Sequence, residues 1–276
     1  MVFSVRSDNL RKVLQEAVRN FTLYGFENPA ILQTWLLRLR VAAQKEAGPL
    51  AAKQQKLRES LTSLFRSMTR KGRMIERANP HVSKVTIDMI APALRSELDR
   101  RILASADLIR LNRDRSIEET LQRFSGWSTS IPPGGSGAVD RREVIAHISK
   151  PLHSRTFEER RLAIDQGHKL ISNVNHMIGI QSGAIAVKWR HVHQAGYDGR
   201  PEHEARDGEY FLLKESWAKE KGFVKKGPNP YYEDIDQAAA LPFCRCWVEY
   251  KISLSQLPDD MLTKKGRKAM EETRIV

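Results

Sequence analysis

Apolar side chains recur at intervals of three and four along the first 180 residues, and this spacing restricts that part of the chain to amphipathic helices. Ser7 or Asp8 can cap a first helix that Gly25 ends. Asn28 opens a second helix, which runs to Gly48. The apolar stripe of the first helix consists of Leu10, Val13, Leu14, Ala17, Val18 and Phe21.

Three more helical segments follow, over residues 51–77, 88–124 and 141–180. Proline lacks the backbone N–H that a helix interior needs. We therefore expect a bend near Pro92 and a break at Pro151.

Residues 125–140 contain two prolines and four glycines, a composition typical of linkers. This segment is expected to be a linker or an extended arm that lies on a neighbouring subunit. A simple loop is the alternative.

Beyond Gly183 the helical spacing gives way to aromatic and β-branched clusters separated by turns, which indicates short strands with long loops. The predicted class is α+β, with a helical N-terminal half and a small mixed α/β C-terminal domain. The expected segments are a helical region (1–124), a linker or arm (125–140), connecting helices (141–180), a mixed domain (181–253) and a charged tail with a short helix (254–276).

Basic residues outnumber acidic ones, 46 to 33, and the formal net charge of +13 favours an anionic partner. One face of the third helical segment is strongly basic, and two lysines beside Gly227 are expected to be exposed. An ordinary solvated surface explains such residues equally well. The candidate contacts to nucleic acid or to an acidic partner are Lys53, Lys56, Arg66, Arg70, Lys71, Arg73, Lys225 and Lys226.

No run of 18 apolar residues occurs, so no membrane span is expected. The first residues lack the apolar stretch and cleavage site of a signal peptide. The two cysteines, Cys244 and Cys246, are too close in sequence for an unstrained disulfide, which favours a reducing, cytoplasmic environment during synthesis.

Cysteine and histidine residues converge on one candidate metal site. His191 and His193 alternate on an expected strand, and Cys244 and Cys246 share the same two-residue spacing. His203 belongs to a short helical turn after Pro201. Thiolate and imidazole are the ligands that zinc prefers. The alternative is that both cysteines are ordinary core residues.

An enzymatic alternative uses the same region. Histidines 191, 193 and 203, together with acidic residues such as Asp207, could hold a divalent metal against a phosphodiester, as in a nuclease or a toxin-like enzyme. No phosphate-binding loop, dinucleotide-binding motif or nucleophile elbow is present. We therefore expect a protein without catalytic residues, and the metal-dependent nuclease is the runner-up.

The order of several residues resembles the C-terminal domain of the phage Mu-type head morphogenesis family, the minor head proteins of tailed phages. The resemblance covers residues 156–253 and follows a tryptophan-ended strand, an R-x-x-H element, a D-G turn and a closing C-R-C. The matching residues are Trp189, Arg200, His203, Asp207, Gly208, Cys244, Arg245 and Cys246.

This resemblance implies a virion protein of low copy number inside the capsid, near the portal, after assembly in the host cytoplasm. Its implied partners are the portal protein, other head proteins and packaged double-stranded DNA, and its implied roles are genome packaging and ejection. His191 and His193 depart from the family pattern. Either His203 alone or a larger histidine set therefore pairs with the cysteines.

Overall fold

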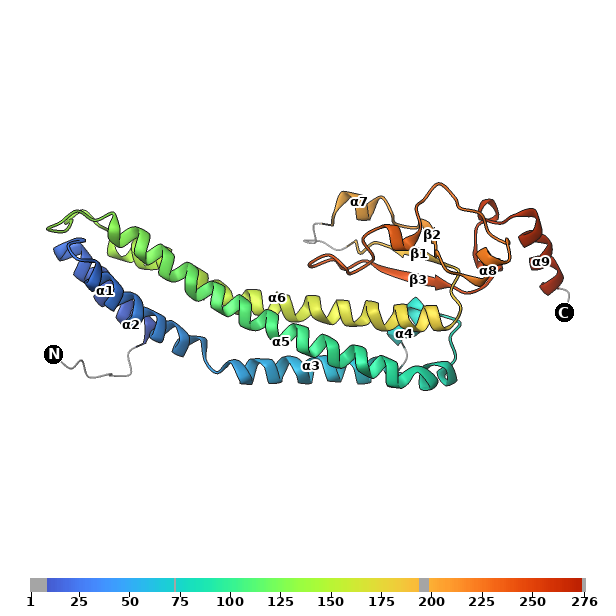
Figure 1. The fold of residues 1–276 in the computed structure, drawn as a ribbon, viewed down its shortest axis with the longest axis horizontal. Helices are drawn as coiled ribbons and strands as arrows, with labels where there is room; N and C mark the ends of the chain where they lie inside the picture. The colour runs from blue at the N-terminus through green and yellow to red at the C-terminus, as the bar shows by residue number, and fades with distance from the viewer. Residues whose placement is uncertain (1–8, 72, 194–198, 275–276) are drawn as a thin grey trace. The chain divides into compact units, whose positions relative to one another are not determined.

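The computed structural model describes residues 9–71, 73–193 and 199–274, without the side chains of residues 71, 73, 273 and 274. Long helices dominate, and one small antiparallel sheet lies in the C-terminal part, so the α+β prediction is confirmed (Figure 1). The chain forms two compact units. Unit 1 comprises Met1–Leu57 and Ser105–Leu162, and unit 2 comprises Arg58–Ala104 and Ala163–Val276. These units do not follow the segment boundaries expected from the sequence.

Unit 1 is an all-helical core. Helix α1 (Leu10–Tyr24) begins after Asn9, whose side chain accepts a hydrogen bond from the Arg11 amide, whereas Ser7 and Asp8 lie outside the described residues. Helix α2 (Pro29–Ala47) begins after the predicted cap Asn28. The core buries the predicted stripe of α1 together with Leu32, Leu39, Ala42, Ala43, Ile117, Leu121, Phe124, Ile148 and Leu152.

Two long helices continue through the prolines at which the sequence predicted a bend and a break. Helix α5 (Lys84–Thr129) passes through Pro92, and helix α6 (Arg141–Gln181) passes through Pro151, so the predicted break at Pro151 is wrong. A proline removes one backbone hydrogen bond, but side chains on both sides of it still pack. Leu152, directly after the second proline, is buried in the core of unit 1.

The glycine-rich segment after α5 folds back onto its own unit. Helix α5 extends to Thr129, so the first five residues of the predicted linker are helical. In the loop that follows, the amides of Gly134 and Ser136 donate to the carbonyls of Tyr24 and Thr22, at 2.9 Å each. Those carbonyls lie in the last turn of α1, where a helix lacks internal donors.

Unit 2 contains the sheet, in the order β2-β1-β3, with both pairs antiparallel. Its strands are β1 (Ala186–Arg190), β2 (Tyr210–Leu212) and β3 (Trp247–Lys251). In Figure 1 the sheet lies along the C-terminal part of α6. The hydroxyl of Tyr250 on β3 and Nδ1 of His176 on α6 are 3.2 Å apart. A Cβ on Gly179 would overlap the Tyr250 ring, so this glycine permits the close approach.

The remaining helical elements complete the chain. Helices α3 (Leu50–Lys71) and α4 (Arg73–Ala78) precede α5. Helices α7 (Pro201–Glu204) and α8 (Trp217–Glu220) and the 3-10 turn η1 (Tyr232–Asp234) lie between the strands. The 3-10 turns η2 (Leu254–Gln256) and η3 (Asp259–Met261) lead to the expected terminal helix, α9 (Lys264–Arg274). Within the described ranges, none of the helices has both the length and the apolar character of a membrane span.

Candidate metal centre

Three predicted ligands meet in unit 2. The ligand atoms of His203, Cys244 and Cys246 all lie within 4.8 Å of one another. Nδ1 of His203 is 3.4 Å from Sγ of Cys244 and 3.7 Å from Sγ of Cys246. The three side chains are 1–3% exposed and belong to the interior of the unit. This cluster could hold a metal ion.

Local structure places these ligands in a way that differs partly from the prediction. His203 lies on the expected helical turn, α7, where Pro201 takes the first position that proline favours. The two cysteines, by contrast, lie in a loop that ends where β3 begins at Trp247. The expected strand there is wrong, but the sulfurs still converge. Phe243, directly before the loop, has a positive φ of 60°, an uncommon conformation for a residue other than glycine.

An aspartate that the sequence analysis missed orients the histidine. Nε2 of His203 forms a hydrogen bond to a carboxylate oxygen of Asp236. A carboxylate only accepts hydrogen bonds, so Nε2 carries a proton toward Asp236, and Nδ1 is the ring atom that faces the sulfurs. Arg206 also donates to Asp236, at 2.8 Å, and its guanidinium lies over the Trp189 ring. Partial burial raises the pKa of Asp236, but the hydrogen bonds from Arg206 and His203 outweigh burial and lower the pKa overall.

The two sulfurs shift each other's pKa in opposite directions. A hydrogen bond from Cys246 lowers the pKa of Cys244 to about 5, and the backbone amides of Ala239 and Cys246 lower it further against the opposing effect of burial. The same contact with Cys244, together with burial, raises the pKa of Cys246. The thiolate is the form that coordinates a metal.

His191 contacts one of the two sulfurs without joining the three-ligand cluster, and His193 contacts neither sulfur. Nδ1 of His191 is 3.4 Å from Sγ of Cys246. Nε2 of His193 instead lies 3.1 Å from Asp207, and the His193 side chain is 61% exposed. Strand β1 ends at Arg190, so the prediction that both histidines lie on a strand is wrong. Asp207 also accepts the His191 amide, and this bond is the main reason why the pKa of Asp207 is lowered.

The remaining residues of the predicted motif surround the same centre. Trp189 is fully buried, and its ring meets that of His203 edge to face, with 5.3 Å between centroids. Arg200 donates to the carbonyl of Pro242, before the cysteine loop, at 3.1 Å. Gly208 has a φ of 82°, as its predicted turn requires. Arg245 lines a pocket beside the loop.

A second missed aspartate holds the cysteine loop from α6. Asp165 accepts a hydrogen bond from the amide of Phe243 at 2.6 Å. It also forms an ion pair with Lys169, with 2.8 Å between Nζ and the carboxylate oxygen. Asp165 is remote from the ligands in sequence, Asp236 lies eight positions before Cys244, and neither stands in a recognisable motif. No sequence signal identifies them.

The predicted basic residues have different surroundings. Lys56, Arg66 and Arg70 are exposed on α3. Lys53 forms an ion pair with Glu159, with 3.5 Å between Nζ and the carboxylate oxygen. The side chains of residues 71 and 73, which include the predicted contacts Lys71 and Arg73, lie outside the part of the chain that is described.

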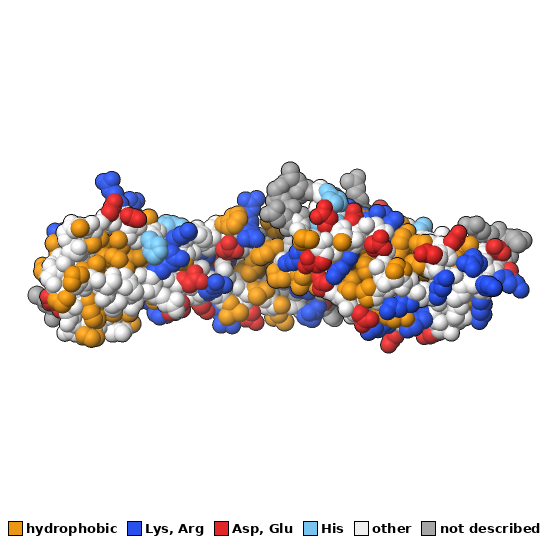
Figure 2. Space-filling model, turned by 90° about the horizontal axis from the view of Figure 1, so that it is seen from above, with side chains coloured by type: hydrophobic (Ala, Val, Ile, Leu, Met, Phe, Trp, Pro, Cys, Tyr) orange, Lys and Arg blue, Asp and Glu red, His pale blue; other side chains and the backbone are white. Residues whose placement is uncertain are grey.

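Lys225 and Lys226 are exposed and belong to a larger group that the sequence analysis missed. The amide of Lys225 donates to the carbonyl of Met261, and a bridge joins Val224 to Leu262. This pairing places both lysines beside the start of α9. We call the exposed group Lys221, Lys225, Lys226, Lys264, Lys265 and Lys268 the lysine patch. Figure 2 shows basic side chains at the α9 end of the face in view.

Comparison with protein-family models, with curated proteins and with solved structures gives no match to this chain.

Proposed function

We propose that this chain is a minor head protein of a tailed phage, a structural protein that acts at the portal in procapsid assembly and in genome packaging or ejection. One observation carries the proposal: the residues on which the family resemblance depends surround a single buried centre. They are spread over the sequence, with 57 positions between Trp189 and Cys246. The order of the motif residues has a physical reason if its members build one structural site.

We propose zinc as the metal of this centre. In a tetrahedral site with Zn–S of ~2.3 Å and Zn–N of ~2.0 Å, a sulfur and a nitrogen ligand lie about 3.5 Å apart. The distances from Nδ1 of His203 to the two sulfurs, 3.4 and 3.7 Å, bracket this value. His191, with Nδ1 3.4 Å from Cys246, is the proposed fourth ligand. Asp236 supplies the carboxylate that commonly orients a zinc-bound histidine.

With His191 as the proposed fourth ligand, the set would be a closed Cys2His2 site, which favours a structural role over catalysis. Catalytic zinc sites keep one position open to water or substrate, whereas structural sites use four protein ligands. His203 and both cysteines are almost completely buried. The zinc would then fix α7 and the cysteine loop against the sheet and would take no part in a reaction.

The lysine patch is the proposed contact to packaged double-stranded DNA. Each phosphate contact contributes about 0.9 to the slope of log affinity against log salt concentration. Replacing Lys225, Lys226, Lys264 and Lys265 with glutamine should reduce this slope by up to about 4. A control with Arg95, Arg110, Arg115 and Arg160 replaced by glutamine removes the same charge elsewhere and should keep the slope close to that of the wild type.

The decisive experiment isolates the tagged chain from phage-infected cells and identifies its partners by mass spectrometry. Portal and head proteins should co-purify, and purified procapsids should contain the chain. Recovery of only ribosomal or metabolic proteins would contradict the assembly role.

The metal-dependent nuclease remains the second candidate, because His193 and Asp207 form a partly exposed pair beside the centre. Its test is cleavage of DNA or RNA by the zinc-loaded and by the magnesium-supplemented protein. Cleavage that disappears in both His203→Ala and Asp207→Asn would favour the enzyme over the structural role.

A further inference from the structure

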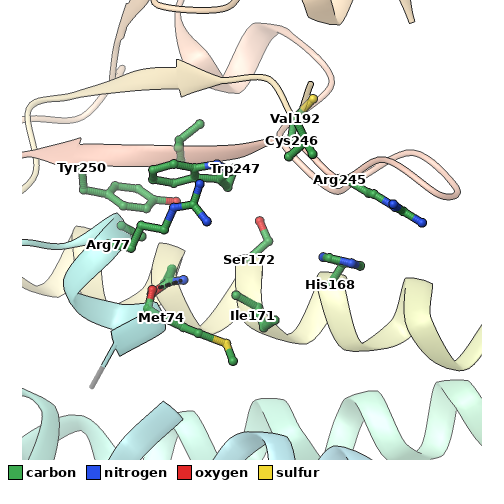
Figure 3. Close-up of a pocket in the computed structure, with 13 residues that line it drawn as sticks. Met74, Arg77, His168, Ile171, Ser172, Val192, Arg245, Cys246, Trp247 and Tyr250 are labelled. Carbon is green, nitrogen blue, oxygen red and sulfur yellow. Dashed lines mark hydrogen bonds between the residues drawn. The ribbon is translucent and has the colours of Figure 1, made fainter. Parts of the chain in front are cut away.

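A slot beside the cysteine loop has the features of a ligand site. Its volume is about 320 Å³, near the lower end of the range for small-molecule sites. Figure 3 shows α6 on one side and β3 with its preceding loop on the other. Ile171 and Ser172 line it from α6, and Cys246 and Trp247 line it from the loop and strand.

The slot is cationic. Arg77 lies at one end, and Arg245 and His168 lie at the other (Figure 3). Among the described residues that line it, there is no aspartate or glutamate. Burial and then the charge of Arg245 lower the pKa of His168, while the nearby Asp165 and Cys244 raise it. These surroundings select a ligand with a negative group.

The other walls favour a planar ring. The Arg77 guanidinium stacks over the partly exposed Trp247 ring, 3.9 Å from its centroid. A stacked guanidinium keeps its in-plane donors and offers flat surface to an aromatic ligand. Met74 and Ile171 add apolar surface. The Ser172 hydroxyl donates to the carbonyl of Ala238 at 2.8 Å, which leaves its oxygen able to accept from a ring amine.

We propose that this slot binds a nucleoside monophosphate unit. The phosphate lies toward Arg245 and His168, and the base lies against Arg77 and Trp247. The unit is either a free nucleotide or the 5′ end of a single strand, since both present the same phosphate and base. This site is separate from the lysine patch and does not depend on the proposed phage role.

The test is calorimetric titration of the full chain with adenosine monophosphate, adenosine and inorganic phosphate. The monophosphate should bind, and the other two should each bind at least about tenfold more weakly, because each lacks half of the recognised groups. Absence of monophosphate binding overturns the proposal. Equal affinity for inorganic phosphate also overturns it, since the ring would then contribute nothing.

Variants locate the binding. Arg245→Gln should weaken binding of the monophosphate about tenfold or more, whereas Arg160→Gln removes an exposed charge on α6 and should leave it unchanged. Ile171→Trp should block the slot by filling it. Unchanged metal content and melting temperature would show that either variant is folded. Equal effects of Arg245→Gln and Arg160→Gln would overturn the assignment.

A 5′-phosphorylated single-stranded oligonucleotide distinguishes the two sources. If it binds more tightly than the free monophosphate and loses this advantage in Arg245→Gln, the ligand is a strand end. If Arg245→Gln weakens only the free monophosphate, the ligand is a free nucleotide.

Discussion

The two compact units are stabilised by different means. Unit 1 buries an apolar cluster in which Phe21 and Phe124 meet edge to face, with 5.7 Å between ring centroids. Unit 2 also has an apolar core, but two cysteines form part of it and a buried histidine lies against them. A helix satisfies its own backbone, whereas three short strands need additional support. We therefore expect the helical unit to depend on apolar burial, and the sheet unit to depend on its polar centre as well.

The largest effect should follow removal of the thiols. A Cys244→Ser/Cys246→Ser variant should not bind the proposed zinc and should lose the folded sheet while keeping the helical unit. In zinc-finger peptides such binding contributes about 10–16 kcal/mol, an upper bound here because the sheet has its own core. Metal analysis and near-ultraviolet circular dichroism would measure both losses. His193→Gln is the control, because this exposed side chain faces Asp207 and not the sulfurs. A double variant with the melting temperature of the wild type would contradict the expectation that the sheet unit depends on its polar centre.

The converse change is Phe124→Ala in the helical unit. Phe124 is fully buried, so truncation should lower the free energy of unfolding by about 3–5 kcal/mol. Zinc content should not change. Chemical denaturation followed by circular dichroism gives the energy, and Leu111→Ala, at an exposed position of α5, is the matched control. Loss of zinc in Phe124→Ala would show that the units are not independent.

A smaller effect should follow Asp236→Asn, which keeps the size of the side chain but removes the charge that orients His203. Loss of such a carboxylate typically weakens metal affinity about 10–100-fold. Competition with a chromogenic chelator would measure the change. Asp234→Asn is the control, because Asp234 pairs with Lys214 and not with the histidine. Equal affinities in the two variants would show that Asp236 does not position a ligand.

The smallest expected effect concerns Glu249 on β3. Burial raises its pKa, but contacts with Lys251 and Arg190 outweigh burial and lower the pKa overall. A lowered pKa stabilises the fold above the unfolded value of about 4.3, and this contribution is lost as the pH falls through the folded value. Between about pH 5 and pH 3 the wild type should therefore lose more stability than Glu249→Gln, by less than about 1 kcal/mol. Melting temperatures across this range, with Glu220→Gln as control, would test the sign.

The sequence predicted the helical half well because its signals are local. The spacing of the stripe in α1, the cap at Asn28 and the end at Gly25 all depend on neighbouring residues. Pro151 misled for the opposite reason. Proline disfavours the interior of a helix, but the side chains before and after Pro151 pack against other helices and keep α6 continuous. A short window of sequence does not contain those packing partners.

The candidate site was predicted only as far as residue chemistry allowed. Cysteine and histidine are recognisable ligands wherever they occur, so His203, Cys244 and Cys246 could be grouped before the fold was known. Asp236 and Asp165 could not, because a carboxylate gains such a role only from its position in three dimensions. The lysine patch was missed for the same reason, since backbone pairing joins residues about 40 positions apart.

The loop after α5 bears on how this protein tolerates change. Its amides occupy the carbonyls at the end of α1, and a Cβ on Gly135 would overlap the Thr22 carbonyl. Epitope tags and fluorescent labels are usually inserted into glycine-rich stretches, on the assumption that such stretches are permissive. Here an insertion would expose the end of α1 and loosen the helical unit, so this stretch is a poor position for a label.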